Sequence, residues 1–196
     1  MAVITIISDY GWKDPYTAAL KGHLLSEIQD CTLVDITHSI PPFNLRETSH
    51  VLNNSYHHFP KNSIHLLCVD EEIKADRKVM AMHFDNHFFV GMDNGLFALI
   101  TQERKDFELF EVDAVLLEEA KTSREKFTII AGHLHRGGKL AMLGKKDEYH
   151  TQYKKYKDRF DSDDEGHARE QDQPGIVQSD GRLGVWEEVH QDAIDG

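Results

Sequence analysis

Three short apolar runs, separated by longer amphipathic segments, limit the folds open to the first 70 residues of this chain. The runs are residues 3–7, 32–36 and 63–69. Each is rich in aliphatic and β-branched side chains and is short enough for a strand buried on both faces. Strand, helix, strand, helix, strand at this spacing is typical of a parallel α/β sheet with right-handed crossovers. The sequence therefore predicts an α/β fold with a parallel-rich central sheet and helices on both faces.

Two helices are expected between these strands. Asp14 is placed to cap the first helix and Pro15 to occupy its first helical position, with an apolar stripe that ends near Asp30. The second helix is expected over residues 45–58, because Pro60 cannot continue it.

The chain beyond the third strand continues the mixed pattern. Residues 79–84 and 87–90 are predicted to form two strands around a turn at Asp85-Asn86. A further strand is expected over residues 107–112 and a helix over residues 125–136. The α/β domain is therefore predicted to span residues 1–144.

Acidic residues stand where two of the predicted parallel strands end. Asp9 follows the first strand, and Asp70 closes the third. Ligands of open α/β sheets gather at the carboxyl ends of the strands, which share one edge. A ligand site containing both carboxylates is therefore expected at that edge.

The last quarter of the chain has a different composition. Residues 145–196 hold 14 acidic and 8 basic residues, which is half of the net charge of −12. Aromatic residues at helical spacing, from Tyr149 to Phe160, favour one helix over residues 147–160. The remainder of this charged tail is predicted to be mostly disordered.

Composition also excludes some classes of function. The net charge of −12 argues against a nucleic-acid partner. No apolar run reaches the roughly 18 residues of a membrane span, and residues 1–7 form a predicted strand rather than a signal peptide. The 2 cysteines in apolar contexts fit a reducing compartment, so a soluble cytoplasmic protein is expected. The 13 histidines form no zinc motif, so structural or surface histidines are favoured over a metal site.

Several ordered motifs within residues 1–144 are shared with one protein family. They are SDYGWKDPY (8–16), KG (21–22), VDITHSIPPF (34–43), FP (59–60), VD (69–70), VGMDNGL (90–96) and AGHL (131–134). Through them the chain resembles the S-adenosylmethionine hydrolases (adenosine-forming), or hydroxide adenosyltransferases, which are related to the fluorinases and chlorinases. The resemblance implies S-adenosylmethionine as substrate, no further cofactor, and a homotrimer whose sites lie between the α/β domain and a neighbour's β-rich C-terminal domain.

The resemblance also implies roles for individual residues. Asp9 would hold the ribose hydroxyls, Asp14 the methionine portion, and Phe43 would line the sugar pocket. A plain helix cap is the alternative for Asp14, and a core position is the alternative for Phe43. Asp93 and Asn94, in a further shared motif, are candidate site contacts.

Asp70 and Arg77 keep the seven-residue separation that the resemblance assigns to hydrolases, whereas halogenases typically have tyrosine at the first position. Asp70 would accept a proton or hydrogen bond from the attacking water, and Arg77 would fix the carboxylate through a charge-assisted pair. An ordinary surface salt bridge is the alternative interpretation.

Three departures from the family pattern keep other functions open. Residues 70–75 read DEEIKA where family hydrolases usually have Asp-Pro-Gly-Val-Gly-Thr, and Thr122 stands where they have a histidine. Ser123 resembles the halogenase version, and nothing after Lys145 resembles the β-rich domain. The main hypothesis is hydrolysis to adenosine and methionine. The alternatives are a weak or inactive adenosylmethionine-binding or nucleoside-binding relative and a halide adenosyltransferase.

Overall fold

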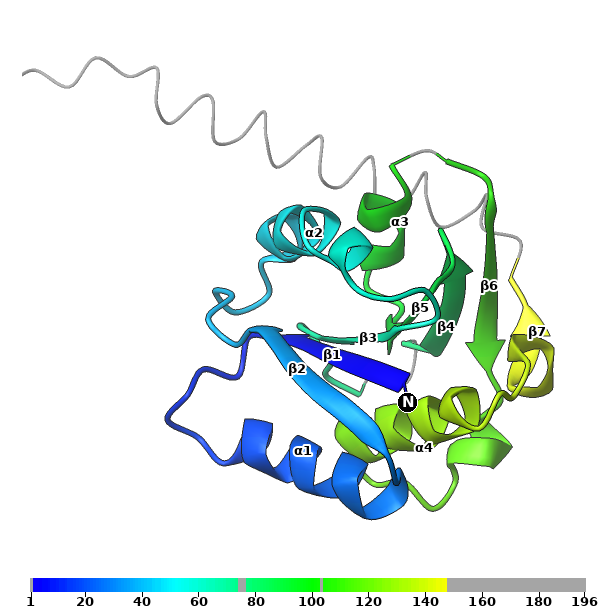
Figure 1. Cartoon of the computed structure of the whole chain (residues 1–196), viewed down its shortest axis with the longest axis horizontal. Helices are drawn as coiled ribbons and strands as arrows, with labels where there is room; N and C mark the ends of the chain where they lie inside the picture. Colours follow the sequence, from blue (N-terminus) through cyan, green and yellow to red (C-terminus); the bar gives the residue numbers. More distant parts are fainter. Residues whose placement is uncertain (1, 74–76, 103, 148–196) are drawn as a thin grey trace, which may run out of the picture. The chain divides into compact units, whose positions relative to one another are not determined.

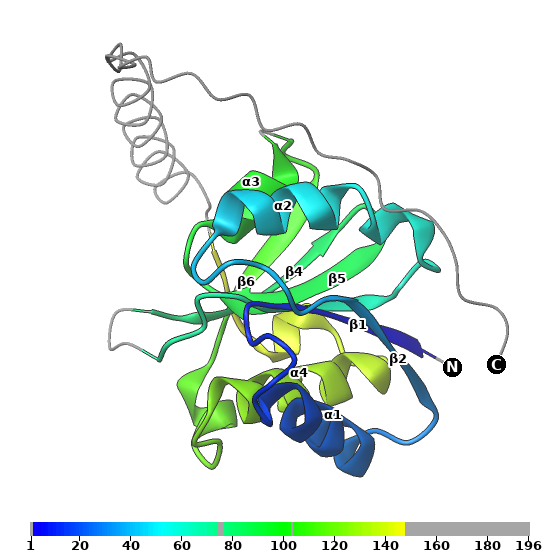
Figure 2. The ribbon, with the colours of Figure 1, turned by 90° about the vertical axis from the view of Figure 1, so that its left-hand side faces the viewer.

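The structure, a computed structural model, describes residues 2–73, 77–102 and 104–147. These residues form a mixed sheet with helices on both faces, which confirms the predicted α/β class (Figures 1 and 2). The predicted charged tail, with its helix over residues 147–160, lies outside the described residues from position 148 onward.

Seven strands and four α-helices are formed by the residues that the structure describes. The strands are β1 (Ala2–Ser8), β2 (Cys31–Thr37), β3 (Ile64–Cys68), β4 (Val79–Phe84), β5 (His87–Met92), β6 (Phe107–Val112) and β7 (Gly144–Lys146). The α-helices are α1 (Tyr16–Glu27), α2 (Leu45–Asn53), α3 (Leu96–Thr101) and α4 (Ser123–His135). Three short 3-10 helices are η1 (Tyr56–His58), η2 (Ala114–Leu117) and η3 (Leu140–Met142).

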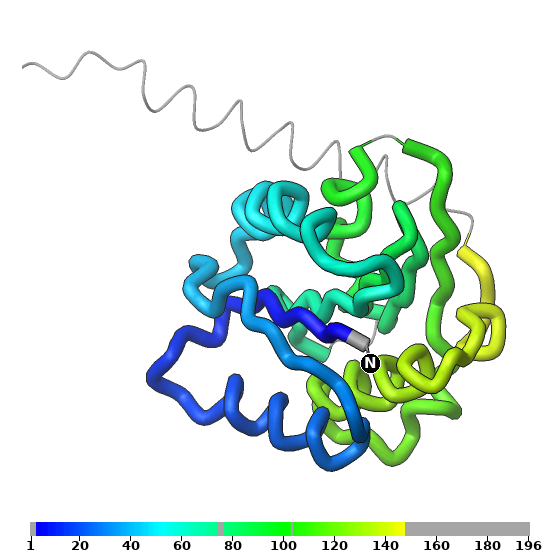
Figure 3. The backbone as a smooth tube through the Cα atoms, viewed as in Figure 1, coloured from blue at the N-terminus to red at the C-terminus, as the bar shows by residue number. Residues whose placement is uncertain are grey.

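The sheet has the strand order β2-β1-β3-β5-β4-β6-β7. The first four strands in this order are mutually parallel, whereas β4, β6 and β7 each run antiparallel to their neighbours. Figure 3 shows the chain reaching one edge of the sheet at β2 (blue) and the other at β7 (yellow). The parallel half carries the strand ends at which a ligand site is expected.

Apolar side chains of the helices cover the two faces of the sheet. Helices α1 and α4 pack together on one face, and α2 and α3 cover the other (Figure 2). The core on the α1 and α4 side includes Leu20, Leu24, Phe127 and Ile130 over Ile4 and Leu66. Burial of these side chains on one face of each helix holds the parallel strands in place.

The predicted turn between β4 and β5 is confirmed. Asp85 and Asn86 have φ angles of 52° and 62° and join two antiparallel strands. Two consecutive residues with positive φ match the type I′ turn, whose twist fits a hairpin and for which Asp and Asn are favoured.

The predicted helix boundaries need correction at three places, and the smallest change is at α4, which spans Ser123–His135 instead of residues 125–136. Pro15, rather than Asp14, is the N-cap of α1, because its carbonyl already accepts the hydrogen bond of Ala19 N at 2.8 Å. Helix α2 ends at Asn53 instead of residue 58, because the side chain of Asn54 donates to His50 O at 2.7 Å and ends the regular turns. The last predicted residues form the separate η1 turn.

Strand β7 was not predicted, and it depends on a close approach of backbone at Gly144. A Cβ atom at this position would lie 2.1 Å from Glu111 O. Gly144→Ala is therefore expected to destabilise the domain by about 1–3 kcal/mol, because the strand pair must separate. Urea unfolding measures this difference.

Gly22→Ala is the matched control, since Gly22 lies in α1 and an added Cβ meets nothing within 4 Å. It is expected to raise the free energy of unfolding by about 0.5–1 kcal/mol. Equal stability of Gly144→Ala and the parent protein would contradict the assigned packing of β7.

Candidate functional site

The carboxyl ends of β1 and β3 meet at one edge of the sheet. Ser8 is in register with Cys68, and Asp9 N donates to Cys68 O at 3.4 Å. Asp9 follows Ser8 directly and Asp70 lies two residues after Cys68, and Asp70 N donates to Asp9 Oδ2 at 3.3 Å, so the two residues lie side by side as expected from the parallel arrangement.

One carboxylate oxygen of Asp9 accepts hydrogen bonds from two loops, one that contains Phe43 and one that contains Asp70. Its Oδ2 accepts hydrogen bonds from Phe43 N at 3.2 Å and from Asp70 N at 3.3 Å. Both donors have positive φ angles, 63° at Phe43 and 48° at Asp70, which are uncommon for residues other than glycine. The Asp9 carboxylate helps to hold both loops in these conformations, and its Oδ1 takes no hydrogen bond from the described part of the chain.

Asp70 and Arg77 form a close pair beside Asp9. Arg77 Nη1 lies 2.7 Å from Asp70 Oδ1 and also donates to Asp70 O at 3.0 Å. The two side chains are only 17% and 12% exposed, respectively for Arg77 and Asp70. The pair is therefore more buried than an ordinary surface salt bridge, and a purely structural ion pair stays the alternative interpretation.

The side chain of Asn94 is hydrogen-bonded to the loop that carries Asp70. Its Nδ2 donates to Val69 O at 2.9 Å and to Asp70 O at 3.4 Å, and its Oδ1 accepts from Leu96 N at 3.1 Å. The side chain is 5% exposed. Asn94 thus fixes the backbone that carries Asp70, while the half-buried Asp93 is bound through its amide to Lys78 O at 2.8 Å.

Thr122 and Ser123 begin α4. The Thr122 hydroxyl accepts from Glu125 N at 3.2 Å, and Glu125 Oε2 accepts from Thr122 N at 3.0 Å, so the two residues form a capping box. Ser123 is 6% exposed and follows directly. The residue at the position of the family histidine therefore has a structural partner of its own.

Asp14 and Phe43 are both exposed in loops at this edge. Asp14 is not the cap of α1, which corrects that interpretation. Phe43 is 66% exposed, so the core interpretation of this residue is wrong as well. Trp12, at 64%, and Ile73, at 46%, are further exposed apolar side chains of the loops after β1 and β3.

A series of polar side-chain contacts lies near the same edge of the sheet and was not predicted from the sequence. Ser8 Oγ lies 2.6 Å from His38 Nδ1, and His38 Nε2 lies 3.1 Å from Asp35 Oδ1. Asp35 Oδ2 accepts from Lys21 Nζ at 2.6 Å. Burial raises the pKa of Asp35, but Lys21 and His38 outweigh it, so this pKa lies below its usual value. The signal available in the sequence was the position of His38, two residues after the predicted strand over residues 32–36.

Glu71, Tyr10 and Arg124 form a second group that sequence reasoning missed. Glu71 Oε1 lies 3.5 Å from Arg124 Nη1, and the Arg124 guanidinium lies 5.8 Å from the centre of the Tyr10 ring. The three residues come from the loop after β3, the first turn of α4 and the loop after β1. Only the acidic residue at position 71, in a loop where the family pattern has proline, pointed to this group.

The described ranges were also searched for a metal site and for a helix that could span a membrane. In residues 2–73, 77–102 and 104–147, no three His, Cys, Asp or Glu side chains group as a metal site. No helix within these ranges is long and apolar enough to cross a membrane.

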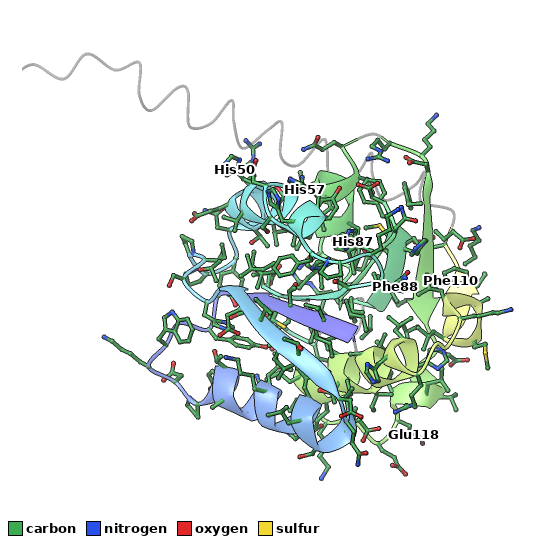
Figure 4. All side chains as sticks on the ribbon, viewed as in Figure 1. His50, His57, His87, Phe88, Phe110 and Glu118 are labelled. Atoms are coloured by element: carbon green, nitrogen blue, oxygen red, sulfur yellow. The ribbon has the colours of Figure 1, made fainter. Side chains whose placement is uncertain are left out.

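A cavity of about 610 Å³ lies at a different place, beside the C-terminal end of α4. Its lining includes Phe88, Phe110, His83 and His135. Figure 4 shows Phe88 and Phe110 on the side of the sheet near β6 and β7. None of the predicted site residues lines this cavity. The candidate site therefore consists of the polar contacts at the carboxyl ends of β1 and β3.

Comparison with known proteins agrees with the motifs at this edge. The family model described as the SAM hydroxide adenosyltransferase N-terminal domain matches residues 4–144. The (R)-S-adenosyl-L-methionine hydrolase of Methanocaldococcus jannaschii is 26% identical over 139 residues, covering 67% of this chain and 52% of the relative. The hydrolase of the same name from Salinispora tropica is 30% identical over 147 residues, with 72% and 56% covered. A fluorinase from Actinopolyspora mzabensis is 24% identical over 172 residues, with 74% and 58% covered.

Solved structures show the same fold. An uncharacterized conserved protein from Thermotoga maritima superposes with a TM-score of 0.67 at 29% identity, covering 74% of this chain and 57% of that one. A conserved hypothetical protein from Thermus thermophilus gives a TM-score of 0.63 at 28% identity, with 78% and 61% covered. The chain spans about half the length of the curated relatives it matches.

Proposed function

This chain belongs to the SAM hydroxide adenosyltransferase family, and on that premise we propose that it hydrolyses S-adenosyl-L-methionine to adenosine and L-methionine. The relatives named as S-adenosyl-L-methionine hydrolases support this reaction. The observation that carries the proposal is the Asp70–Arg77 pair, at 2.7 Å, beside Asp9 at the carboxyl edge of the sheet.

The reaction is a displacement at the ribose 5′ carbon. The sulfonium sulfur is already a good leaving group, so catalysis depends on an oriented nucleophile more than on acid assistance. Asp70 accepts a hydrogen bond from the attacking water, and Arg77 fixes the carboxylate through its charge-assisted hydrogen bond. Arg77 stays protonated and therefore does not act as the base.

Three further residues are assigned to substrate binding in this proposal. Asp9 binds the ribose hydroxyls through Oδ1, while its Oδ2 holds the two loops. The exposed ring of Phe43 covers the sugar, and Asp14 contacts the methionine portion. The exposed apolar side chains at this edge support a homotrimer in which a neighbouring subunit covers the site.

A binding protein without turnover is the second candidate. The capping box favours it, because the Thr122 hydroxyl at the position of the family histidine is already bound to Glu125 N. A hydroxyl group in this environment is also a poor proton acceptor at neutral pH. Ser123 at the start of α4 and the similarity to a fluorinase are the observations that favour a halide as nucleophile.

The test is incubation of the purified chain with S-adenosyl-L-methionine, with adenosine followed by chromatography. Adenosine above the level of a protein-free blank is expected. Calorimetric binding without adenosine would favour the second candidate, and absence of both would reject both. Parallel reactions with fluoride or chloride are expected to give no halogenated nucleoside.

A further inference from the structure

His38 is a fully buried histidine that no step of the proposed reaction uses. It directly follows β2, the strand that lies parallel to β1 in the sheet (Figure 1), and it is 0% exposed. The ring of Trp12 packs edge-on against the imidazole, with 4.7 Å between the ring centres. Burial of a polar ring costs free energy unless its nitrogen atoms have partners, so the contacts of His38 call for an explanation.

Both ring nitrogens of His38 face polar side chains. Nδ1 lies 2.6 Å from Ser8 Oγ, and Nε2 lies 3.1 Å from Asp35 Oδ1. The last two atoms are buried, and the described ranges offer neither of them another hydrogen-bond partner. Although burial raises the pKa of Asp35, Lys21 and His38 hold this pKa below its usual value, so Asp35 is a carboxylate that only accepts. Nε2 therefore carries a proton, and in the neutral ring Nδ1 is left to accept from the Ser8 hydroxyl.

The Ser8 hydroxyl in turn fixes the backbone around Asp9. Its Oγ accepts from Tyr10 N at 3.4 Å, so these three residues form a serine turn with Asp9 in the middle. The carbonyl of His38 accepts from Gly11 N at 2.8 Å, which holds the next residue of the same loop. The ring and the backbone of His38 thus hold residues on both sides of Asp9.

The Asp9 carboxylate depends on the position of this turn. Its Oδ2 accepts from Phe43 N and Asp70 N, whereas its Oδ1 takes no hydrogen bond from the described residues. Phe43 belongs to the loop that begins at His38, so this loop contacts the loop of Asp9 at three points. A carboxylate displaced from this position would lose either the two amides or the hydroxyl groups that it is proposed to bind.

We propose that His38 is a positioning residue, which through the Ser8 hydroxyl holds the Asp9 carboxylate where it binds the ribose hydroxyls. The inference rests on the proposed function, in which Asp9 has that role. His38 itself makes no contact with the substrate and transfers no proton. Its effect is therefore confined to the part of the binding free energy that comes from the ribose hydroxyls.

Calorimetric binding of adenosine and of 2′,3′-dideoxyadenosine separates this role from a general loss of structure. The parent protein is expected to bind adenosine about 10–100-fold more tightly, because only adenosine offers hydroxyl groups to the charged Asp9. Ser8→Ala and His38→Leu are each expected to remove most of this preference. The affinity for 2′,3′-dideoxyadenosine is expected to change by less than about threefold, because that nucleoside makes no contact with Asp9.

Two further variants serve as rescue and control. His38→Asn is expected to restore part of the preference, because the asparagine Oδ1 can accept from Ser8 in place of Nδ1. Ser63→Ala is the matched control, since Ser63 is 1% exposed and its hydroxyl makes a contact of the same length, 2.6 Å to Pro60 O. Ser63 directly precedes β3, at the opposite end of that strand from the site. Its substitution is expected to keep the parental preference.

The outcomes for the positioning role and for the hydrolysis are distinct. A Ser8→Ala variant that keeps the parental preference, or that binds both nucleosides more weakly by the same factor, would overturn the role of His38 and leave the hydrolysis intact. A parent protein that binds both nucleosides equally, or neither, would overturn it as well. Loss of the preference in Ser8→Ala, together with a parent protein that releases no adenosine from S-adenosyl-L-methionine, would support the role of His38 and reject the hydrolysis.

Discussion

Asp70→Asn is expected to lower kcat for adenosine release by about 10²–10⁴-fold and also to lower the thermal stability, because the half-buried Arg77 loses a charged partner. The amide cannot form the charge-assisted pair that Arg77 now makes with Oδ1 at 2.7 Å, so both the water and the guanidinium lose their orientation. Asparagine tolerates the positive φ of this position, which keeps the backbone in place. Initial rates at saturating S-adenosyl-L-methionine measure the effect.

Asp30→Asn is the matched control for this change. Asp30 has a similar φ of 59° but lies exposed between α1 and β2, away from the site. Its substitution is expected to leave kcat unchanged. Full activity of Asp70→Asn in the same assay would remove Asp70 from the mechanism, whatever the fate of the fold.

His65 is expected to make the domain sensitive to acid. It is fully buried, its Nδ1 lies 2.6 Å from Thr5 Oγ1, and its Nε2 lies 3.1 Å from His87 Nδ1. Burial, with a smaller contribution from His87, lowers the pKa of His65 to about 3, compared with an ordinary value near 6.5. The unfolded chain therefore binds more protons than the folded one between these two values.

Because the folded-state pKa is lowered, the contribution of His65 is complete above about pH 6.5 and is lost as the pH falls toward 3. The full loss lowers the free energy of unfolding by an amount on the order of 5 kcal/mol. Urea unfolding at several pH values between 7 and 4 is expected to show this decline. His87 adds to it, since burial lowers its pKa as well.

His65→Gln is expected to flatten the decline, because the amide can still bond to Thr5 and cannot take up a proton. His23→Gln serves as the control, since His23 is exposed on α1. An equally steep decline in His65→Gln would show that other groups cause the acid sensitivity.

Regular periodicity and turn chemistry made most of the fold predictable. The buried strands read directly from apolar runs, and the hairpin reads from Asp85-Asn86 because few residues accept two consecutive positive φ angles. Strand β7 has no such local signal. It forms because Gly144 lets two backbones approach, which only the folded chain reveals.

The candidate site was predictable in part for a similar reason. Parallel strands bring Asp9 and Asp70 to one edge whatever the surrounding side chains are, so their proximity followed from topology. The contact of Glu71 with Arg124 depends on how α4 docks beside the loop after β3, and no spacing in the sequence encodes it. Thr122 differs from this case, because Thr122 and Glu125 have the Thr-x-x-Glu spacing of a capping box, which is a local sequence signal for the start of α4.

Asp9 Oδ2 accepts hydrogen bonds from both loops, so the free energy of ordering one loop depends on whether the other loop is ordered. A molecule that binds Asp9 Oδ2 would displace the amides of Phe43 and Asp70 together. A molecule that binds the carboxylate without displacing these amides would make both loops more rigid. Ordering of one loop thus lowers the cost of ordering the other. Occupancy of the ribose position and alignment of the nucleophile are therefore expected to be cooperative and reciprocal.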